Sequence, residues 1–466
     1  MKLTKIILLP ALTVFLLSTL GSCNIYKKYS TPDSTALLAE YKKVQDAEID
    51  SMAFGNLQWQ SVFTDPVLAG LIEKALENNI DLRNAKLNVD IAHAQLKGAR
   101  LSYLPSVGIG ASASTAKYFT NPSSGAMQWG YQIPLSVSWE IDIFAKLLNS
   151  NRGAKASYEM TQDYNRAVRS QIIGAVANTY YAIAAVESQL VVSRSTSELW
   201  KQSVQTMKDF KEAGLVTEVA VVQSEAQYYG ILGSITDLEV ALDELNNTMS
   251  ILLGVMPQKW EIPADAVLNV PAIKRESVPM IELAMRPDVA AAERNMAVAY
   301  YATNSARAAF YPGLSITANG GFTNLLGSMI VNPGEFFINL AGSLTVPLFS
   351  RGQNIARLEA TKAQQQQAMN SFEKTLMSAS AEVSDAMTLY EKSIEKQQYL
   401  TKQAEKLASA VDYTQELLRL GSYGTTYLDV LTAQQNLLGA QLSAISARNS
   451  EASALINLYQ SLGGGR

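Results

Sequence analysis

Few side chains in this sequence could carry out acid–base, nucleophilic or metal chemistry. The 466 residues include one histidine, His93, and one cysteine, Cys23. A structural zinc site usually needs four Cys or His ligands, and a disulfide within the chain needs two cysteines, so the sequence excludes both. A hydrolase with a histidine base would have to use His93, which falls in a helical stretch near Asp90 and Gln95. We interpret His93 as a solvated or packed side chain, and we expect no enzyme activity, no metal and no cofactor.

A second arrangement with possible chemistry is a pair of carboxylates, Glu140 and Asp142. Paired carboxylates carry out glycoside hydrolysis when they flank a glycosidic bond. These two alternate with Trp139, Ile141 and Ile143, however, so both fall on the polar face of an expected strand. We therefore interpret them as adjacent charges on the solvated, lumen-facing side of the strands.

Composition and charge argue against one broad class of partner. Charged residues make up 17% of the chain, against about 25% in an average globular protein. The 38 Lys and Arg residues are balanced by 42 Asp and Glu residues, which gives a formal net charge of −4. Nucleic-acid-binding domains normally carry a basic surface, so we expect no nucleic-acid partner. The hydrophobic residues, 48% of the chain, suffice for a large buried core.

The first 22 residues have the pattern of a secretory signal. Lys2 and Lys5 precede an apolar stretch that ends at Leu20 and is too short to span a bilayer comfortably. The lone cysteine follows in the sequence Leu20-Gly21-Ser22-Cys23, which resembles a bacterial lipobox. We predict a lipoprotein signal peptide over 1–22, a lipid anchor at Cys23 and a lipid-linked segment over 23–60. An ordinary secretory signal with a chance cysteine is the alternative.

The chain also contains an internal duplication. Asp81-Leu82 matches Asp288-Val289 and Leu104-Pro105 matches Tyr311-Pro312, at one constant offset. The period is far longer than that of a solenoid repeat. We predict a first structural repeat over 61–256, a proline-rich linker over 257–279 and a second structural repeat over 280–466. Each repeat has the expected order of helix, two strands, very long helix, turn and helix.

Strand-like alternation of apolar and polar residues marks four segments: 106–114, 131–143, 314–319 and 336–346. Aromatic residues on the apolar side, such as Trp139 and Phe336, suit a lipid-facing wall, although hairpins lying on a soluble core are the alternative. A membrane barrel needs at least about eight strands, and an open sheet edge cannot face lipid. If these segments span a membrane, several chains must share one barrel, and three copies would supply twelve strands.

Two stretches predict very long helices, from about Leu147 to Glu212 and from Gly352 to about Leu420. Neither contains proline, and each would extend roughly 100 Å at about 1.5 Å per residue. Alanine, glutamine and serine dominate, which suits close helix packing in a long coiled coil. The turns that follow begin at Gly214 and Gly421. Thr217 is the expected N-cap of the first returning helix, and Thr425 or Thr426 is that of the second.

The order and spacing of these elements resemble the TolC family of outer-membrane efflux proteins, from about Trp59 to Leu462. The resemblance is carried by the strand-to-helix junction Trp139-Glu140-Ile141-Asp142-Ile143-Phe144, the repeat start Arg286-Pro287-Asp288-Val289, and the tips Gly214-Leu215-Val216-Thr217 and Tyr427-Leu428-Asp429-Val430-Leu431-Thr432-Ala433-Gln434. The lipobox cysteine narrows it to the NodT-like branch, the lipoprotein exit ducts of resistance-nodulation-division pumps.

The resemblance implies a mixed α/β membrane protein that forms a homotrimer. Each chain would contribute four strands to a twelve-stranded outer-membrane β-barrel and two long antiparallel hairpins to a coiled-coil α-helical tunnel in the periplasm. A periplasmic adaptor protein would join the tunnel to an inner-membrane resistance-nodulation-division pump. The implied location is the bacterial outer membrane, with a lipid anchor and an extension into the periplasm.

The resemblance also implies a gate at the closed end of the tunnel. Asp429 matches a position where the family places an acidic residue, and three copies would form a negative ring that favours cations. The family often has a second aspartate one turn later, where this chain has Thr432, and the matching place in the first tip holds Ala220. The alternative is that Asp429 is a first-turn carboxylate favoured by the helix dipole.

The tips are the expected adaptor-docking residues: Gly214, Leu215, Val216 and Thr217 in the first, and Gly421, Ser422 and Tyr423 in the second. An exposed Leu-Val pair at a turn suggests that a partner covers it. The alternative is that these residues only shape the turns. The second tip is expected to be the longer by two residues.

These features together predict a passive outer-membrane exit duct for small toxic compounds or drugs, which docks to a periplasmic adaptor. One alternative is the exit duct of a protein-secretion system. A second, of a different class, is a structural periplasmic coiled-coil tether without a pore. A tether would be expected to have one helical hairpin and no alternating strands.

Overall fold

The computed structural model describes residues 26–44, 57–116, 128–266, 280–326, 335–349, 351–420, 424 and 426–465. The predicted signal peptide, Cys23, and the tip residues Gly421, Ser422 and Tyr423 lie outside the described residues. The fold divides into two compact units. The strand unit comprises residues up to Pro32, Asn88–Gln162 and Ala291–Glu373, and the hairpin unit comprises Asp33–Leu87, Asp163–Ala290 and Lys374–Arg466. Each predicted repeat contributes to both units.

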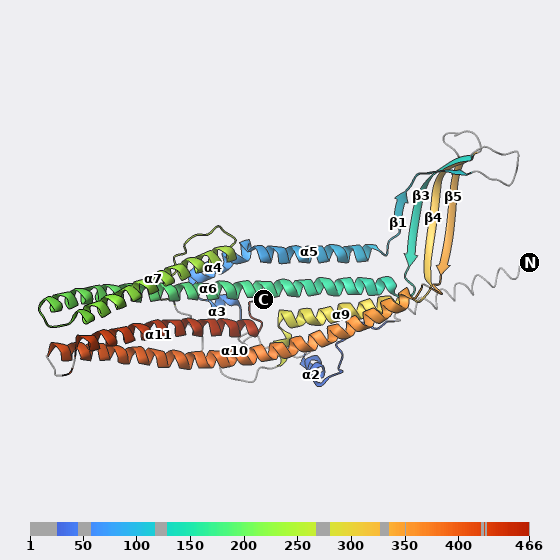
Figure 1. Cartoon of the computed structure of the whole chain (residues 1–466). Coiled ribbons are helices and arrows are strands. Elements are labelled where there is room, and N and C mark those ends of the chain that lie inside the picture. The colour runs from blue at the N-terminus through green and yellow to red at the C-terminus, as the bar shows by residue number, and fades with distance from the viewer. Residues whose placement is uncertain are drawn as a thin grey trace, which may run out of the picture. The chain divides into compact units, whose positions relative to one another are not determined.

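The helices confirm the duplication, because three of them recur with equal lengths (Figure 1). Helices α5 (Ile80–Leu101) and α9 (Pro287–Ala308) each have 22 residues. The long helices α6 (Lys146–Glu212) and α10 (Gln353–Arg419) each have 67, and α7 (Glu218–Leu252) and α11 (Tyr427–Ser461) each have 35. The remaining described helices are short: α2 (Ala36–Val44), α3 (Trp59–Val62), α4 (Pro66–Asn78) and α8 (Met280–Ala284).

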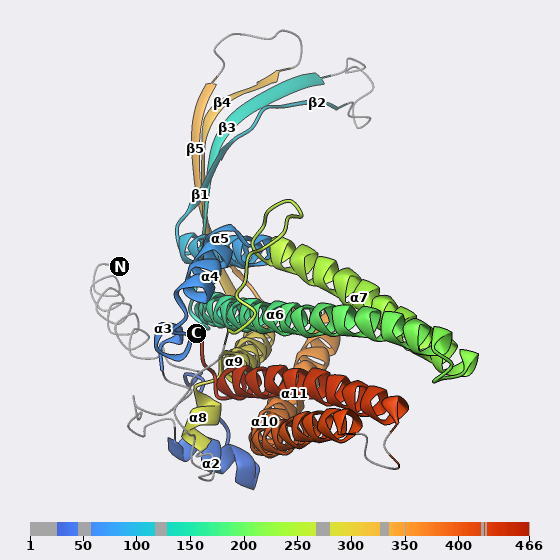
Figure 2. The same cartoon turned by 90° about the vertical axis from the view of Figure 1, so that its left-hand side faces the viewer.

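The strand unit contains one antiparallel sheet in the order β1-β3-β4-β5 (Figure 1), with β2 also paired to β3 (Figure 2). The strands are β1 (Ser106–Ile109), β2 (Ser112–Ala116), β3 (Gln128–Ile141), β4 (Gly313–Leu326) and β5 (Glu335–Thr345). Five described strands replace the four expected segments, because the first segment is interrupted. Its two parts keep one register on β3, and Pro134, which has no N–H to donate, lies opposite Gly110.

The sheet register confirms that the two faces differ in polarity. Val137 of β3 lies opposite Val107 and Ala318, and Ala318 lies opposite Leu340 of β5. The same face carries these residues: Ile109, Ile133, Leu135, Trp139, Ile141, Leu314, Ile316, Phe322, Phe336, Ile338 and Leu344. The opposite face carries mostly polar side chains, including Gln132, Ser136, Ser138, Glu140, Thr317, Asn319 and Asn339. The alternation in the sequence therefore becomes one continuous apolar face.

The hairpin unit contains two antiparallel helix pairs, the part of α6 from Asp163 with α7 and the part of α10 from Lys374 with α11, which lie side by side (Figure 2). Near the tips, Trp200 and Ile231 of the first pair share a buried cluster with Leu431 of α11. The rings of Phe210 and Tyr427 meet edge to face, with centroids 6.2 Å apart. Aromatic and aliphatic packing thus joins the two hairpins near their ends.

The main core of the hairpin unit lies where the short helices α3 and α4 meet the long ones. It contains Trp59, Phe63, Leu68, Ile72, Tyr180, Met249, Leu253 and Tyr459. Asp65 starts α4 as its N-cap, and its carboxylate accepts the N–H of Val67 at 2.8 Å and the hydroxyl of Tyr180 at 2.6 Å. Pro66 at the first helical position has no N–H that would need a partner. One carboxylate therefore starts α4 and ties it to α6.

Across the described residues, no helix combines the length and the apolar character that a membrane-spanning helix requires.

Candidate functional site

The first tip is a glycine-terminated helix end followed by an exposed apolar residue. Gly214 has φ 72°, in the left-handed region that favours glycine. Its N–H donates to the carbonyl of Lys211 at 2.9 Å, and the N–H of Leu215 donates to the carbonyl of Phe210 at 2.8 Å. This pair of bonds is a Schellman motif, which satisfies the last carbonyls of α6. The motif leaves the Leu215 side chain 71% exposed.

Ion pairs also connect α6 and α7 next to this turn. Lys211 of α6 pairs with Glu218 of α7, and Lys208 pairs with Glu225 at 2.8 Å. Thr217 occupies the N-cap position of α7, as predicted, but its side chain makes no capping hydrogen bond. The first tip therefore presents Leu215 on a turn whose shape is set by the backbone and by side-chain charges.

Replacing Gly214 with alanine is expected to loosen the first tip. An added Cβ would meet no atom within 4 Å, so the left-handed backbone is the only cost, about 1 kcal/mol. Gly230, in the middle of α7, also has open space, and there alanine should stabilise the helix by about 0.5–1 kcal/mol. Amide hydrogen exchange should become faster around the turn in Gly214→Ala and not in Gly230→Ala. Equal rates in the two variants would contradict the backbone explanation.

The second tip starts α11 with a complete capping box. The Asp429 carboxylate accepts the N–H of Thr426 at 2.7 Å and its hydroxyl at 2.8 Å, and the N–H of Asp429 lies 3.4 Å from the Thr426 hydroxyl. The backbone and then the side-chain hydrogen bonds from Thr426 hold the pKa of Asp429 below its usual value. Thr426 is thus the N-cap, one of the two residues predicted, and Asp429 is a charged residue with a structural role in its own chain.

Thr432 lies one turn further along α11. Its hydroxyl donates to the carbonyl of Leu428 at 2.8 Å, and the side chain is exposed. Both gate candidates are therefore on the first turns of α11, and their own helix accounts for their hydrogen bonds. The helix bounds agree with the expected difference of two residues between the tips, since α7 begins at Glu218 after α6 ends at Glu212, while α11 begins at Tyr427 after α10 ends at Arg419.

The two carboxylates at the strand-to-helix junction have separate contacts. Glu140 forms an ion pair with Lys146, in which Nζ lies 2.8 Å from the carboxylate, and the Asp142 carboxylate accepts the N–H of Leu148 at 2.7 Å. Strand β3 ends at Ile141, earlier than the sequence suggested. Asp142 instead accepts a backbone N–H in the first turn of α6, which has no partner within the helix. Their position in the lumen stays a prediction.

His93 is exposed, with its ring 5.5 Å from that of Tyr158. Within the described ranges, no three His, Cys, Asp or Glu side chains are grouped as metal ligands would be.

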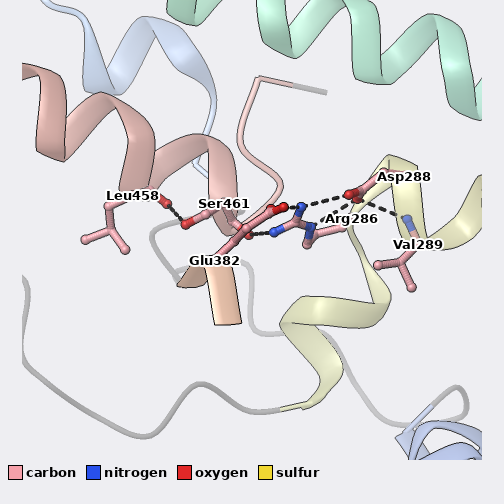
Figure 3. Close-up of polar contacts among 6 residues, drawn as sticks. All are labelled: Arg286, Asp288, Val289, Glu382, Leu458 and Ser461. Atoms are coloured by element: carbon pink, nitrogen blue, oxygen red, sulfur yellow. Dashed lines mark hydrogen bonds and ion pairs between the residues drawn. The ribbon is translucent and has the colours of Figure 1, made fainter. Parts of the chain in front are cut away.

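The structure also brings together a cluster at the start of α9 that the sequence did not identify as a site (Figure 3). The Arg286 side chain is 8% exposed. Its Nε and Nη2 donate to the two oxygens of Asp288 at 3.0 and 2.7 Å, Nη2 also reaches Glu382 of α10 at 2.6 Å, and Nη1 donates to the carbonyl of Ser461 at 2.8 Å. One guanidinium therefore joins α9, α10 and the last residue of α11.

Burial by itself would lower the pKa of Arg286, but hydrogen bonds and charge interactions with Asp288 and Glu382 outweigh it and raise the pKa above its usual value. The guanidinium is therefore charged at any physiological pH.

The first repeat has a simpler version of this junction. Asn79, between α4 and α5, donates to the carbonyl of Leu252, the last residue of α7, at 2.9 Å. Gly254 and Gly463 follow the two helix ends with φ 64° and 83°. A Cβ on Gly254 would lie 2.5 Å from the carbonyl oxygen of Asn78. In both repeats, a buried side chain thus fixes the base of a hairpin, and only the second repeat uses a charge.

Comparison with known proteins places this architecture in a family. The sequence model described as outer membrane efflux protein matches residues 71–255 and 278–464. The chain is similar to the toluene efflux pump outer membrane protein TtgC of Pseudomonas putida, with 29% identity that covers 99% of this chain and 96% of TtgC. It is also similar to the cation efflux system protein CusC of Escherichia coli K12, with 27% identity that covers 96% and 97% of the two chains.

Solved structures show the same fold. The outer-membrane channel OprN superposes with a TM-score of 0.81 and 25% identity, over 95% of this chain and 99% of OprN. The family match covers well over half of the chain, in two segments that contain the paired helices and strands. This chain belongs to the family of outer membrane efflux proteins.

Proposed function

We propose that this protein is the outer-membrane exit duct of a tripartite pump that expels small toxic compounds. The observation that carries the proposal is the continuous apolar face of the sheet, on a chain that also has two long helical hairpins. On that face, Ile338 and Leu340 are 76% and 73% exposed in the single chain. Apolar side chains exposed along a whole sheet face suit a hydrocarbon environment.

The edges of the sheet support assembly from several copies. Within the described residues, β5 pairs only with β4, and the interrupted strand of β1 and β2 pairs only with β3. An unpaired edge in hydrocarbon leaves its backbone groups without hydrogen bonds, at a cost of several kcal/mol per group. Pairing β5 of one copy with β1 and β2 of the next removes both edges. Three copies give a closed barrel of twelve spans, which is the homotrimer we propose.

The tips are the proposed contact with a periplasmic adaptor, which connects the duct to an inner-membrane resistance-nodulation-division pump. The exposed Leu215 on a rigid turn supports this. We assign docking to Leu215 with Gly214, Val216 and Thr217, and to Gly421, Ser422 and Tyr423. Cys23 is the proposed lipid anchor, after removal of residues 1–22.

We propose that Asp429 and Thr432 line the closed end of the tunnel. The lowered pKa keeps Asp429 charged throughout the physiological range, so three copies would form a ring of negative charge that favours cations. Glu140 and Asp142 are the proposed lumen-facing carboxylates near the barrel. Each already has a partner in its own chain, so they would tune the field in the duct rather than bind cargo.

Small compounds are the proposed cargo. The relative TtgC is named for toluene efflux and CusC for cation efflux, and neither name refers to protein secretion. A passive duct lowers a diffusion barrier, and the inner-membrane pump supplies the energy and most of the selectivity. A periplasmic tether would not need the exposed apolar face of the sheet.

The test is growth of a strain that lacks the gene, across detergents, dyes, antibiotics and metal salts, with secreted proteins assayed in parallel. We expect increased sensitivity to small compounds. The intact gene should restore resistance, and a Leu215→Asp variant present at equal abundance in the outer membrane should not. Loss of a secreted protein with unchanged sensitivity would overturn the proposal in favour of the secretion duct. Full rescue by Leu215→Asp would overturn the docking role alone.

A further inference from the structure

A cavity of about 270 Å³ lies within the hairpin unit, between α6, α10, α11 and the segment that follows α7. Tyr181 of α6, Tyr390 of α10, and Asn449 and Glu451 of α11 line it. Small apolar residues, including Ala184, Ala452 and Leu455, form much of the remaining wall. Ligand pockets typically have volumes of about 300–1,000 Å³, so this cavity suits a small molecule.

Two acceptor groups that line the cavity, on Glu451 and Asn449, have no donor among the described residues. Glu451 has no ion pair within 4 Å and no hydrogen bond in the part of the chain that the structure describes. Burial raises the pKa of Glu451, and Arg448 offsets this only in part. The Oδ1 atom of Asn449 is buried and also has no hydrogen-bond partner among the described residues. A buried amide oxygen and a partly buried carboxylate in one cavity, both without donors, are costly unless a ligand supplies the hydrogens.

The other polar lining groups are engaged elsewhere. The Ser188 hydroxyl donates to the carbonyl of Ala264, and the Gln397 amide donates to the hydroxyl of Thr401 at 3.3 Å. Arg448 is exposed, and its guanidinium lies 3.5 Å from the carbonyl of Asp265. Arg448, the positively charged residue of the lining, thus contacts the segment that follows α7 and makes no ion pair with Glu451.

Two aromatic rings complete the lining. Tyr181 is 4% exposed and Tyr390 is 9% exposed. Burial raises the pKa of each hydroxyl, so both rings are neutral, and the charge of Glu451 adds to the effect on Tyr390. The faces of aromatic rings attract cations, and aromatic side chains are a common environment for organic ammonium groups.

We propose that this cavity binds a small organic ammonium ion, with its N–H groups directed to Glu451 and Asn449 and its apolar body against Tyr181, Tyr390 and the alanines. An ammonium group supplies three hydrogen-bond donors and a positive charge, which match the Asn449 oxygen and the Glu451 carboxylate. The inference concerns a ligand site in the helical wall, and it stands whether or not the protein is an efflux duct.

The test is isothermal titration calorimetry of the full-length protein in lipid nanodiscs with 2-phenylethylammonium chloride. The neutral 2-phenylethanol, of nearly the same shape, is the control ligand. We expect the ammonium ion to bind at least tenfold more tightly than the alcohol, because hydrogen bonds between charged groups are stronger than those of a neutral hydroxyl.

Variants identify the site. Glu451→Gln keeps the size of the side chain, removes its charge and should weaken binding at least tenfold, and Tyr390→Leu should weaken it by removal of the ring. Glu405→Gln, at an exposed position of α10 outside the cavity, is the matched control and should bind as the unchanged protein does. No binding by the unchanged protein, equal binding of the alcohol, or equal weakening by Glu405→Gln would overturn the proposal. Circular dichroism of each variant confirms that it is folded, so a loss of helix cannot pass for a loss of the site.

Discussion

Replacing Arg286 with alanine is expected to destabilise the protein by about 3 kcal/mol. Removal of one partner from a buried ion pair typically costs about 3–5 kcal/mol, because the groups left behind lose their compensation. The lower end applies here, since the side chains of Asp288 and Glu382 are 45% and 57% exposed and can be solvated. The carbonyl of Ser461 would also lose its donor. Thermal unfolding of the purified protein, followed by the helical circular dichroism signal, measures the effect.

Two further variants separate the geometry of Arg286 from its charge. Arg286→Lys keeps the charge but loses the planar fork that reaches three partners, so an intermediate loss is expected. Arg294→Ala removes a side chain that is 45% exposed, whose ion pair with Glu159 spans 3.5 Å, and it should change stability by less than about 1 kcal/mol. Equal melting temperatures for Arg286→Ala and Arg294→Ala would refute the interpretation of the cluster as the base of the second hairpin.

The elements of this fold could be predicted because their signals are local. Alternation of apolar and polar residues marks β3 and β5, and long stretches without proline that end near Gly214 and Gly421 mark α6 and α10. The matching helix lengths follow from the duplication. The need for further copies could also be inferred, since four strands are too few to close a barrel.

The junction at Arg286 could not be predicted from those signals, because its partners are distant in sequence. Ser461 lies 175 residues away and Glu382 lies 96 residues away. The motif Arg286-Pro287-Asp288 identifies a helix start, with proline and an acidic residue in the first turn, but it does not show that the arginine is buried. The one available signal was the pair Gly254 and Gly463, which mark equivalent helix ends in the two repeats.

Similar limits apply to Asp142 and Asp429. Each was identified by residue type and position, and each takes part in the start of a helix, which the sequence admits but does not require. An acidic residue in a first helical turn has this local role available in any fold. A role toward the lumen depends on copies of the chain, so it cannot follow from local pattern alone.

Adjacent residues of β5 provide the sharpest test of the sheet. Leu340 lies on the apolar face, opposite Ala318, and Asn339 lies on the polar face, opposite Asn319. Leu340→Arg should destabilise the membrane-inserted form by about 2–4 kcal/mol, the cost of an arginine near the bilayer midplane on a lipid-facing strand. Asn339→Arg adds the same side chain one position away, toward water, and should be tolerated.

The measurement is the amount of folded, heat-modifiable assembly in purified outer membranes for the two variants. Because successive side chains of a strand point to opposite faces, Leu340→Arg and Asn339→Arg introduce the same charged side chain on opposite faces of one strand. A difference between them therefore reports which face meets lipid. A large loss for Leu340→Arg with little loss for Asn339→Arg agrees with the register. The reverse order would mean that the polar face is outside, and it would rule out the apolar face as the membrane contact on which the proposed duct depends.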